Sequence, residues 1–154
     1  DTGTNMSMTI NAAASDLRKV EDPTLEPEYD SELGQSVVAI AKASLGKPYR
    51  HGGEGPDDFD TTGFVGYCFR ENGISVPRSL APQFEYGAPV PKDALKPGDV
   101  VFFFLENPGE AEYVGIYVGD GKFIAVSTSQ NAVLERDMGS NYYADRYVGA
   151  RRYS

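Results

Sequence analysis

The clearest helical pattern in the chain lies at residues 31–45. Its apolar face is formed by five residues at helical spacing: Leu33, Val37, Ile40, Ala41 and Leu45. Asp30 or Ser31 can cap the first turn, and Gly46 can end the helix. This pattern predicts an amphipathic helix that packs against a core.

Two further helices are predicted after a loop rich in glycine and proline at residues 47–59. The second helix begins near Thr61 or Thr62 and ends at Gly73. Its apolar members are Phe64, Val65, Cys68 and Phe69. A short third helix is expected around residues 79–86.

From residue 98 onward the pattern changes to short runs of aromatic and β-branched residues, which favour strands. The runs lie at residues 100–105, 113–118, 122–126, 133–135 and 147–152. Asp120-Gly121 separates two of them and is typical of a hairpin turn. Helices followed by an antiparallel meander predict an α+β domain over residues 31–154.

Residues 1–30 differ from the rest of the chain. Residues 1–11 are small and polar, and residues 22–28 are acidic and interrupted by two prolines. Such a segment buries little apolar surface, which predicts a flexible acidic linker. A short helix at residues 12–20 is a weak alternative within it.

Composition excludes several classes of partner. The 154 residues carry a formal net charge of −9, which argues against nucleic acid and against anionic membrane surfaces. No apolar run approaches the roughly 20 residues of a membrane-spanning helix. The single cysteine, Cys68, cannot form an internal disulfide. The first residue is Asp1 rather than methionine, which fits a mature chain whose leader has been removed.

Six sequence strings resemble the NlpC family of bacterial cell-wall cysteine peptidases, and they occur in the family's order. They are Leu45–Tyr49 with Gly52-Gly53, Phe59–Phe64, Gly73–Ser79 with Gln83 beyond, Leu95–Phe103, Val114–Ile124 and Tyr147–Arg152. The resemblance implies a papain-like fold, with helices packed on a mainly antiparallel sheet. It also implies a substrate class, the peptide stems of peptidoglycan cut next to D-glutamate, and a secreted or cell-envelope location.

The three positions at which this family carries its catalytic residues hold different chemistry in this chain. The nucleophilic cysteine is replaced by Thr61, whose hydroxyl does not ionise usefully without a strong adjacent base. The histidine base is replaced by Tyr113, and a phenol with an ordinary pKa of ~10 is a poor base near neutrality. The residue that orients the base is replaced by Ala125, which has no polar side-chain atom. The sequence therefore predicts a domain that does not hydrolyse peptides.

Two other residues are candidates for a displaced catalytic role. His51 is the only histidine, and it is more simply read as a residue lining the groove than as a relocated base. Cys68 shares a helix face with Thr61 but lies about 10 Å further along the axis. A small apolar core residue is the simpler reading of Cys68.

A set of polar residues around the nucleophile position is expected to hold the substrate. The family resemblance assigns Asp60 and Thr62 to the substrate's amino end and retains a tyrosine at Tyr49. His51, Arg78 and Ser79 are expected to line the same groove. The competing reading is structural, because Asp60 can simply cap the helix and Tyr49 can simply pack.

No metal or cofactor is predicted. Glu54, Asp57, Asp58 and Asp60 form an acidic run, and Asp58, Asp60 and Thr62-Gly63 match the opening of a calcium loop. Phe69 occupies the position that requires the bidentate glutamate, so this match fails. One histidine and one cysteine also exclude an ordinary structural zinc site.

Three functional hypotheses follow. The first is a binding module that holds a peptidoglycan stem peptide, or an envelope protein, without cutting it. The second is a weak or altered hydrolase that uses Thr61 with His51. The third is a purely structural domain, which requires a filled groove.

Overall fold

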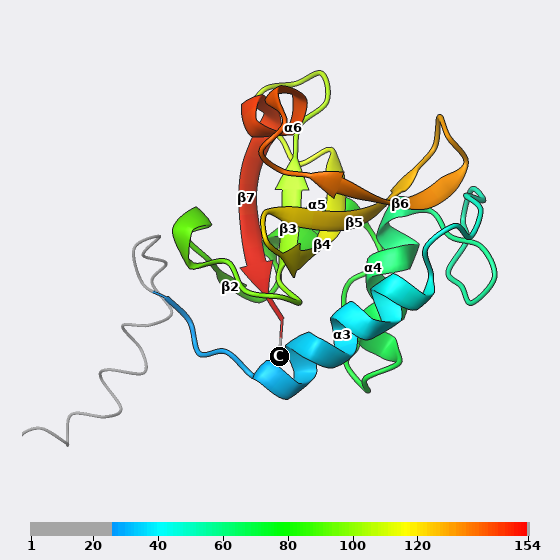
Figure 1. Ribbon diagram of the computed structural model, residues 1–154, viewed down its shortest axis with the longest axis horizontal. Helices are drawn as coiled ribbons and strands as arrows, with labels where there is room; N and C mark the ends of the chain where they lie inside the picture. The colour runs from blue at the N-terminus through cyan, green and yellow to red at the C-terminus, as the bar shows by residue number, and fades with distance from the viewer. Residues whose placement is uncertain (1–25, 154) are drawn as a thin grey trace, which may run out of the picture.

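The computed structural model of the protein describes residues 26–153 (Figure 1). The possible helix at residues 12–20 lies outside the described residues. Within the described part, no helix is long and apolar enough to cross a membrane.

The three predicted helices are confirmed, each with a shorter C-terminal end than expected. They are α3 (Ser31–Ala43), α4 (Thr61–Arg70) and α5 (Leu80–Glu85). Asp30 caps α3, because its side chain accepts hydrogen bonds from the amides of Glu32 and Leu33 at 3.1 Å each.

The five predicted strands form one antiparallel sheet with a sixth, short strand. The strands are β2 (Ala88–Pro89), β3 (Val100–Phe103), β4 (Tyr113–Gly119), β5 (Lys122–Ser127), β6 (Ala132–Asp137) and β7 (Tyr147–Arg152). Their order in the sheet is β2-β7-β3-β4-β5-β6. The predicted hairpin joins β4 to β5 through Asp120 (φ 53°) and Gly121 (φ 73°), the positive angles that a tight hairpin turn requires.

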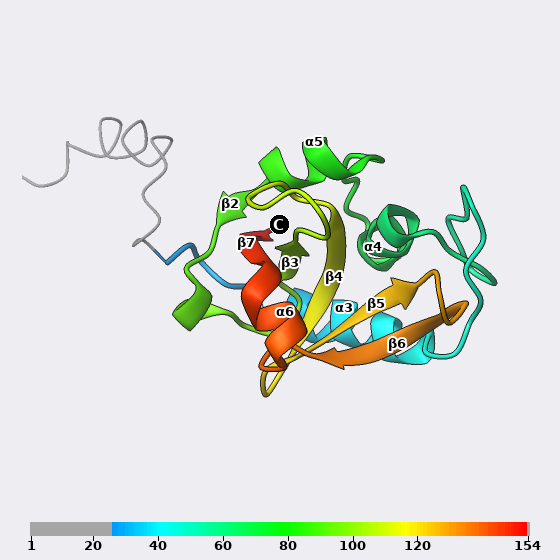
Figure 2. The ribbon, with the colours of Figure 1, turned by 90° about the horizontal axis from the view of Figure 1, so that it is seen from above.

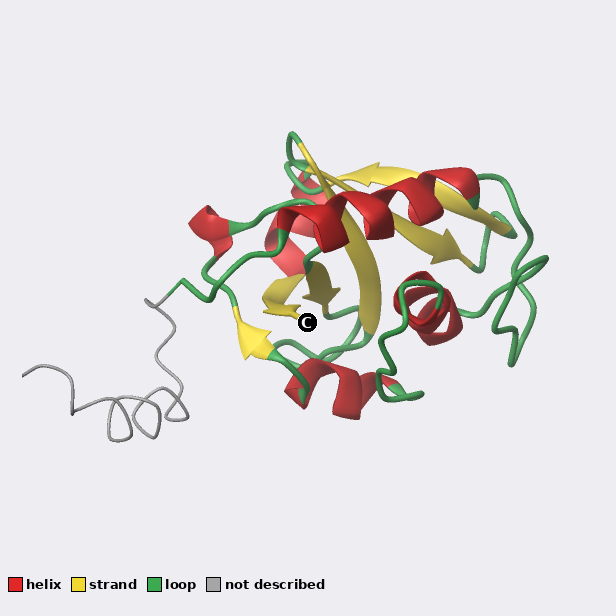
Figure 3. Cartoon of the chain, turned by 90° about the horizontal axis from the view of Figure 1, so that it is seen from below, coloured by secondary structure: helices red, strands yellow, loops and turns green. Residues whose placement is uncertain are grey.

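Helices α3 and α4 lie on one side of the sheet (Figure 3). Their apolar faces and one face of the sheet form what we call the helix-side core. Its members include Val37, Ala41, Phe64, Val65, Val114, Ile116, Ile124 and Val126. The fold is therefore the papain-like α+β arrangement that the sequence predicts.

The opposite face of the sheet is covered by a helix that the sequence pattern did not predict, α6 (Asn141–Arg146) (Figure 2). Tyr143 of this helix packs against Phe103, Tyr113 and Phe123, and we call these four residues the aromatic cluster. Side chains alternate between the two faces of a strand, so Tyr113 and Val114 belong to different cores.

A buried ion pair attaches the start of the described chain to the sheet. Arg152 at the end of β7 donates to Asp99 through Nε at 2.7 Å and Nη2 at 2.8 Å. The same guanidinium donates to the carbonyl of Pro27 at 2.7 Å, and the Tyr29 hydroxyl donates to the carbonyl of Pro97 at 2.7 Å. Residues 27–29 thus lie against the body of the protein before α3 begins.

Candidate functional site

The candidate site is built at the N-terminus of α4, where Thr61 is the first helical residue. Asp60 precedes it in an extended conformation and caps the helix, with its carboxylate accepting from the Gly63 amide at 2.6 Å. A side chain at Gly63 would collide with the carbonyl of Gly53, so this turn lies tightly against the preceding loop. Thr61 is half-buried.

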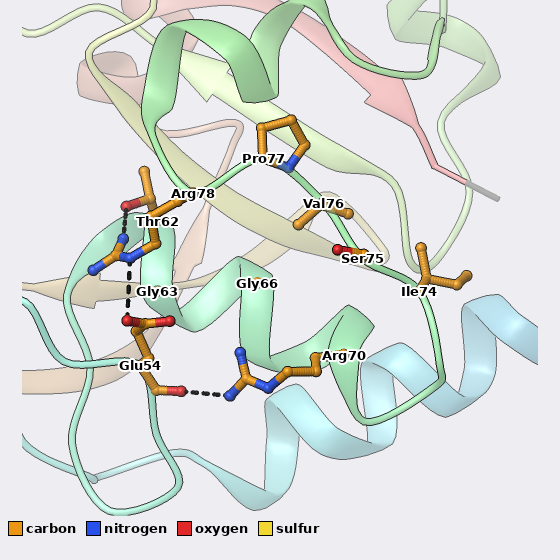
Figure 4. A pocket seen from close by; sticks show the side chains of 10 residues that line it. All are labelled: Glu54, Thr62, Gly63, Gly66, Arg70, Ile74, Ser75, Val76, Pro77 and Arg78. Carbon is orange, nitrogen blue, oxygen red and sulfur yellow. Dashed lines mark hydrogen bonds and ion pairs between the residues drawn. The ribbon is translucent and has the colours of Figure 1, made fainter.

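Three of the predicted site residues are brought together beside this helix end. The Arg78 guanidinium forms a paired contact with Asp60, Nη2 to Oδ2 at 2.7 Å and Nη1 to Oδ1 at 3.2 Å. Arg78 Nη1 also donates to the Thr62 hydroxyl at 2.7 Å, and that hydroxyl lies 3.3 Å from Asp60 Oδ1. The three side chains form one connected polar group, part of which Figure 4 shows.

The Asp60 carboxylate is ionised near neutral pH. Partial burial acts to raise its pKa, but hydrogen bonds from Arg78 and from the Gly63 amide outweigh that effect, and the pKa lies below its ordinary value. The neighbouring guanidinium offsets the carboxylate's charge. Asp60 is therefore both a helix cap and the partner of Arg78.

Two residues without a predicted role in the site take part in this group. Glu54 Oε2 lies 3.5 Å from Arg78 Nε. The fully buried Gln83 donates through Nε2 to the carbonyls of Thr62 at 3.2 Å and Pro77 at 2.8 Å. Gln83 thus ties the first turn of α4 to the segment that carries Arg78. In the sequence, the one indication of a role for Gln83 is its position just beyond the Gly73–Ser79 string that resembles the family.

Tyr113 and Ala125, at the predicted positions of the base and its orienting group, lie together among the buried residues on the sheet face that α6 covers. Tyr113 is 8% exposed and Ala125 is fully buried. The Tyr113 hydroxyl donates to the carbonyl of Val126 at 2.7 Å, and its ring stacks on Tyr143 with 6.2 Å between ring centres. Burial raises the pKa of the Tyr113 phenol above its ordinary value, so the side chain stays protonated near neutrality. Because the resemblance assigns all three positions to one catalytic site, Thr61 is predicted to meet these two residues at one end of a groove, and this stays a prediction.

The remaining candidates lie around the site in different settings. Tyr49 is half-buried and packs against the helix-side core, and its main-chain amide donates to Asn131 Oδ1 at 3.1 Å. His51 is exposed in a turn, and Ser79 is the exposed residue that precedes α5.

Cys68 faces the helix-side core and is fully buried, and burial raises the pKa of its thiol. A buried thiol held in its neutral form is a poor nucleophile. Over residues 26–153, no group of three or more histidine, cysteine or acidic side chains is arranged to hold a metal ion.

The chain is similar to several known peptidases over most of its length. It is 38% identical over 143 residues to the murein DD-endopeptidase MepH of Escherichia coli (strain K12), covering 88% of this chain and 53% of the relative. It is 35% identical over 130 residues to a gamma-DL-glutamyl hydrolase of Bacillus subtilis (strain 168), covering 82% of this chain and 31% of the relative. The chain thus spans about half, or less, of the length of these relatives.

Solved structures give the same relationship. An NlpC/P60 family protein from Bacillus cereus ATCC 10987 has a TM-score of 0.72 at 30% identity, covering 84% of this chain and 41% of that chain. NlpC2 from Trichomonas vaginalis has a TM-score of 0.73 at 28% identity, covering 85% of this chain and 50% of that chain. The family's sequence profile matches residues 46–152. The chain therefore belongs to the NlpC/P60 family.

Proposed function

We propose that this protein is a non-hydrolysing member of the NlpC/P60 family. The observation that carries the proposal is the state of Tyr113, whose phenol is buried, protonated and bonded to a main-chain carbonyl. A base must accept a proton near neutral pH, and this group has neither the pKa nor the free geometry to do so. Thr61 supplies no thiolate, and Ala125 supplies no polar atom to orient a base.

We further propose that the polar group of Asp60, Thr62 and Arg78, beside Tyr49, holds a peptidoglycan stem peptide or an envelope protein partner. The relatives' names include a murein endopeptidase and a glutamyl hydrolase, which supports this substrate class and a secreted or envelope location. The Asp60 carboxylate at the start of α4 is the acidic group that would pair with a ligand's free amino end.

The observation that favours a purely structural domain is the burial of Tyr113 and Ala125, because core side chains at these positions are not available to a ligand. A hydrolase that uses Thr61 with His51 requires an imidazole within hydrogen-bond reach of the hydroxyl. The exposed turn that carries His51 gives no support to that arrangement.

Binding of a soluble muropeptide with a free amino end is expected at a Kd of roughly 10 μM to 1 mM. Asp60→Asn keeps the shape of the side chain and removes its charge, so the Kd should rise by about three- to tenfold. Calorimetry at low and moderate salt measures both values. Asp58→Asn is the matched control, because Asp58 pairs with Arg50 in an exposed ion pair outside this group. If Asp60→Asn and the unmodified protein bind the muropeptide equally well, Asp60 acts only as a helix cap. If neither protein binds it, the reading as a purely structural domain is favoured.

Thr61→Cys alone is expected to produce no measurable peptidase activity. The thiol would gain the positive end of α4 but no imidazole, so it would lack both an activating base and a proton donor for the leaving amine. Cleavage of a muropeptide by the purified variant, followed by mass spectrometry, checks this. Robust turnover would mean that His51 already serves as the base, and Thr61→Cys combined with His51→Ala would then lose it.

A further inference from the structure

Gly66 lies in the interior of α4, where glycine is less favourable than alanine. Two common reasons for a helical glycine do not apply to it. It is not among the glycines with positive φ, and a Cβ built on it meets no atom within 4 Å. The missing side chain leaves open space on the flank of α4, and that space belongs to a pocket.

The pocket has a volume of about 200 Å³ and lies between α4 and the segment 74–78 (Figure 4). Ile74, Val76 and Pro77 supply its apolar lining, and Gly66 contributes only main chain on the helix side. Glu54 and Arg70 stand at its charged edge. The space equals the liquid volume of about seven water molecules, which suits an amino-acid-sized ligand.

The charges around the pocket have both signs, and two of them are only weakly engaged. Arg78 is already paired with Asp60 at 2.7 Å. The Glu54 side chain is 55% exposed, and its contact with Arg78 Nε is long at 3.5 Å. Arg70 is exposed and donates through Nη2 to the main-chain carbonyl of Glu54 at 2.9 Å. One carboxylate and one guanidinium are thus available at the edge of an apolar recess.

We propose that this pocket binds a small zwitterion, an α-amino acid with a short aliphatic side chain. Its ammonium group pairs with the Glu54 carboxylate, and its carboxylate pairs with the Arg70 guanidinium. Its side chain fills the space over Gly66 against Ile74, Val76 and Pro77. A zwitterion keeps the pocket electrically neutral, whereas an anion or a cation would leave one partner without a counter-charge. Thr62 and Arg78 of the proposed stem-peptide site also line this pocket. The proposal goes beyond the proposed function because Gly66, Arg70 and residues 74–77 take no part in that function.

Valine is the probe, and two molecules that each lack one of its charged groups are the comparisons. Isovalerate lacks the ammonium group, and isobutylamine lacks the carboxylate. Titration of the full chain, followed by the NMR shifts of the Gly63, Gly66 and Ser75 amides, should give a valine Kd of roughly 1–10 mM. Isovalerate and isobutylamine should bind at least about fivefold more weakly. Equal affinity for valine and isovalerate, or no shift with valine at 50 mM (on the order of five times the weakest expected Kd), would overturn the proposal.

Two substitutions place the binding in this pocket. Gly66→Leu puts a side chain into the open space and should abolish the valine shifts while keeping the folded spectrum, because leucine is a better helix former than glycine. Glu54→Gln should weaken valine binding until its Kd equals that of isovalerate. The Kd of isovalerate itself should stay unchanged within about twofold. Glu71→Gln is the matched control, since Glu71 is exposed at the end of α4 and does not line the pocket. The assignment of valine binding to this pocket would be contradicted if Gly66→Leu bound valine as well as the unmodified protein does. Equal losses of valine affinity in Glu54→Gln and Glu71→Gln would also contradict it.

Discussion

Asp99→Ala is expected to lower the free energy of unfolding by about 3–5 kcal/mol. Asp99 is 1% exposed and Arg152 is 6% exposed, so the substitution would leave a buried guanidinium without its counter-charge. It would also remove the acceptor for the Lys96 amide, which donates to Asp99 Oδ2 at 2.8 Å. The end of β7, the turn before β3 and the segment at Pro27 all meet at this ion pair.

Urea denaturation followed by circular dichroism measures the change. Asp58→Ala is the matched control, because it removes the exposed Arg50–Asp58 contact of 2.9 Å, whose side chains are 63% and 31% exposed. Such a surface pair contributes about 0–1 kcal/mol. Losses of equal size in the two variants would show that the Asp99–Arg152 pair is not an anchor of the fold.

Tyr113→Ala is expected to destabilise the protein by about 3–5 kcal/mol. The substitution deletes a ring that packs on Tyr143 and Phe103, and it leaves the Val126 carbonyl without the phenol donor. The resemblance to the family predicts that this position serves catalysis in its peptidases. Here a large cost would show that the position has become part of the core.

Tyr142→Ala is the control for this second prediction. It makes the same chemical change at a neighbouring aromatic residue that is 48% exposed. The expected loss there is below about 1 kcal/mol, as for most surface substitutions. If Tyr113→Ala costs no more than Tyr142→Ala in the same urea titration, Tyr113 is not a core residue, and the main support for lost catalysis fails.

Most of the fold could be predicted from local patterns. The apolar face of α3, the aromatic and β-branched runs of β3 to β5 and the Asp120-Gly121 turn each carry their signal within a few residues. α6 was missed because Asn141–Arg146 has one short turn of polar and aromatic residues with no helical periodicity. β2 was missed because its two residues form a strand only through pairing with Arg151 and Arg152, far along the chain.

The site was predictable in part. The capping role of Asp60 was one of two readings of its place before Thr61, and the structure confirms that it caps α4. The pairing of Asp60 with Arg78 joins residues that are distant in sequence, so neither residue signals it alone. The ring of Tyr113 stacks on Tyr143 of α6, a helix that the sequence pattern did not predict. For this reason the surroundings of Tyr113 could not be predicted from the sequence.

The measurement that tests the central proposal most directly is a cleavage assay on purified protein. Muropeptides and whole cell walls are incubated with the protein, with Thr61→Ala, and with the murein DD-endopeptidase MepH as the active control, and the soluble products are identified by mass spectrometry. The proposal predicts product from the active control only, and the same background from the protein and from Thr61→Ala. Reproducible cleavage by the protein that disappears in Thr61→Ala would contradict it and would identify Thr61 as a working nucleophile.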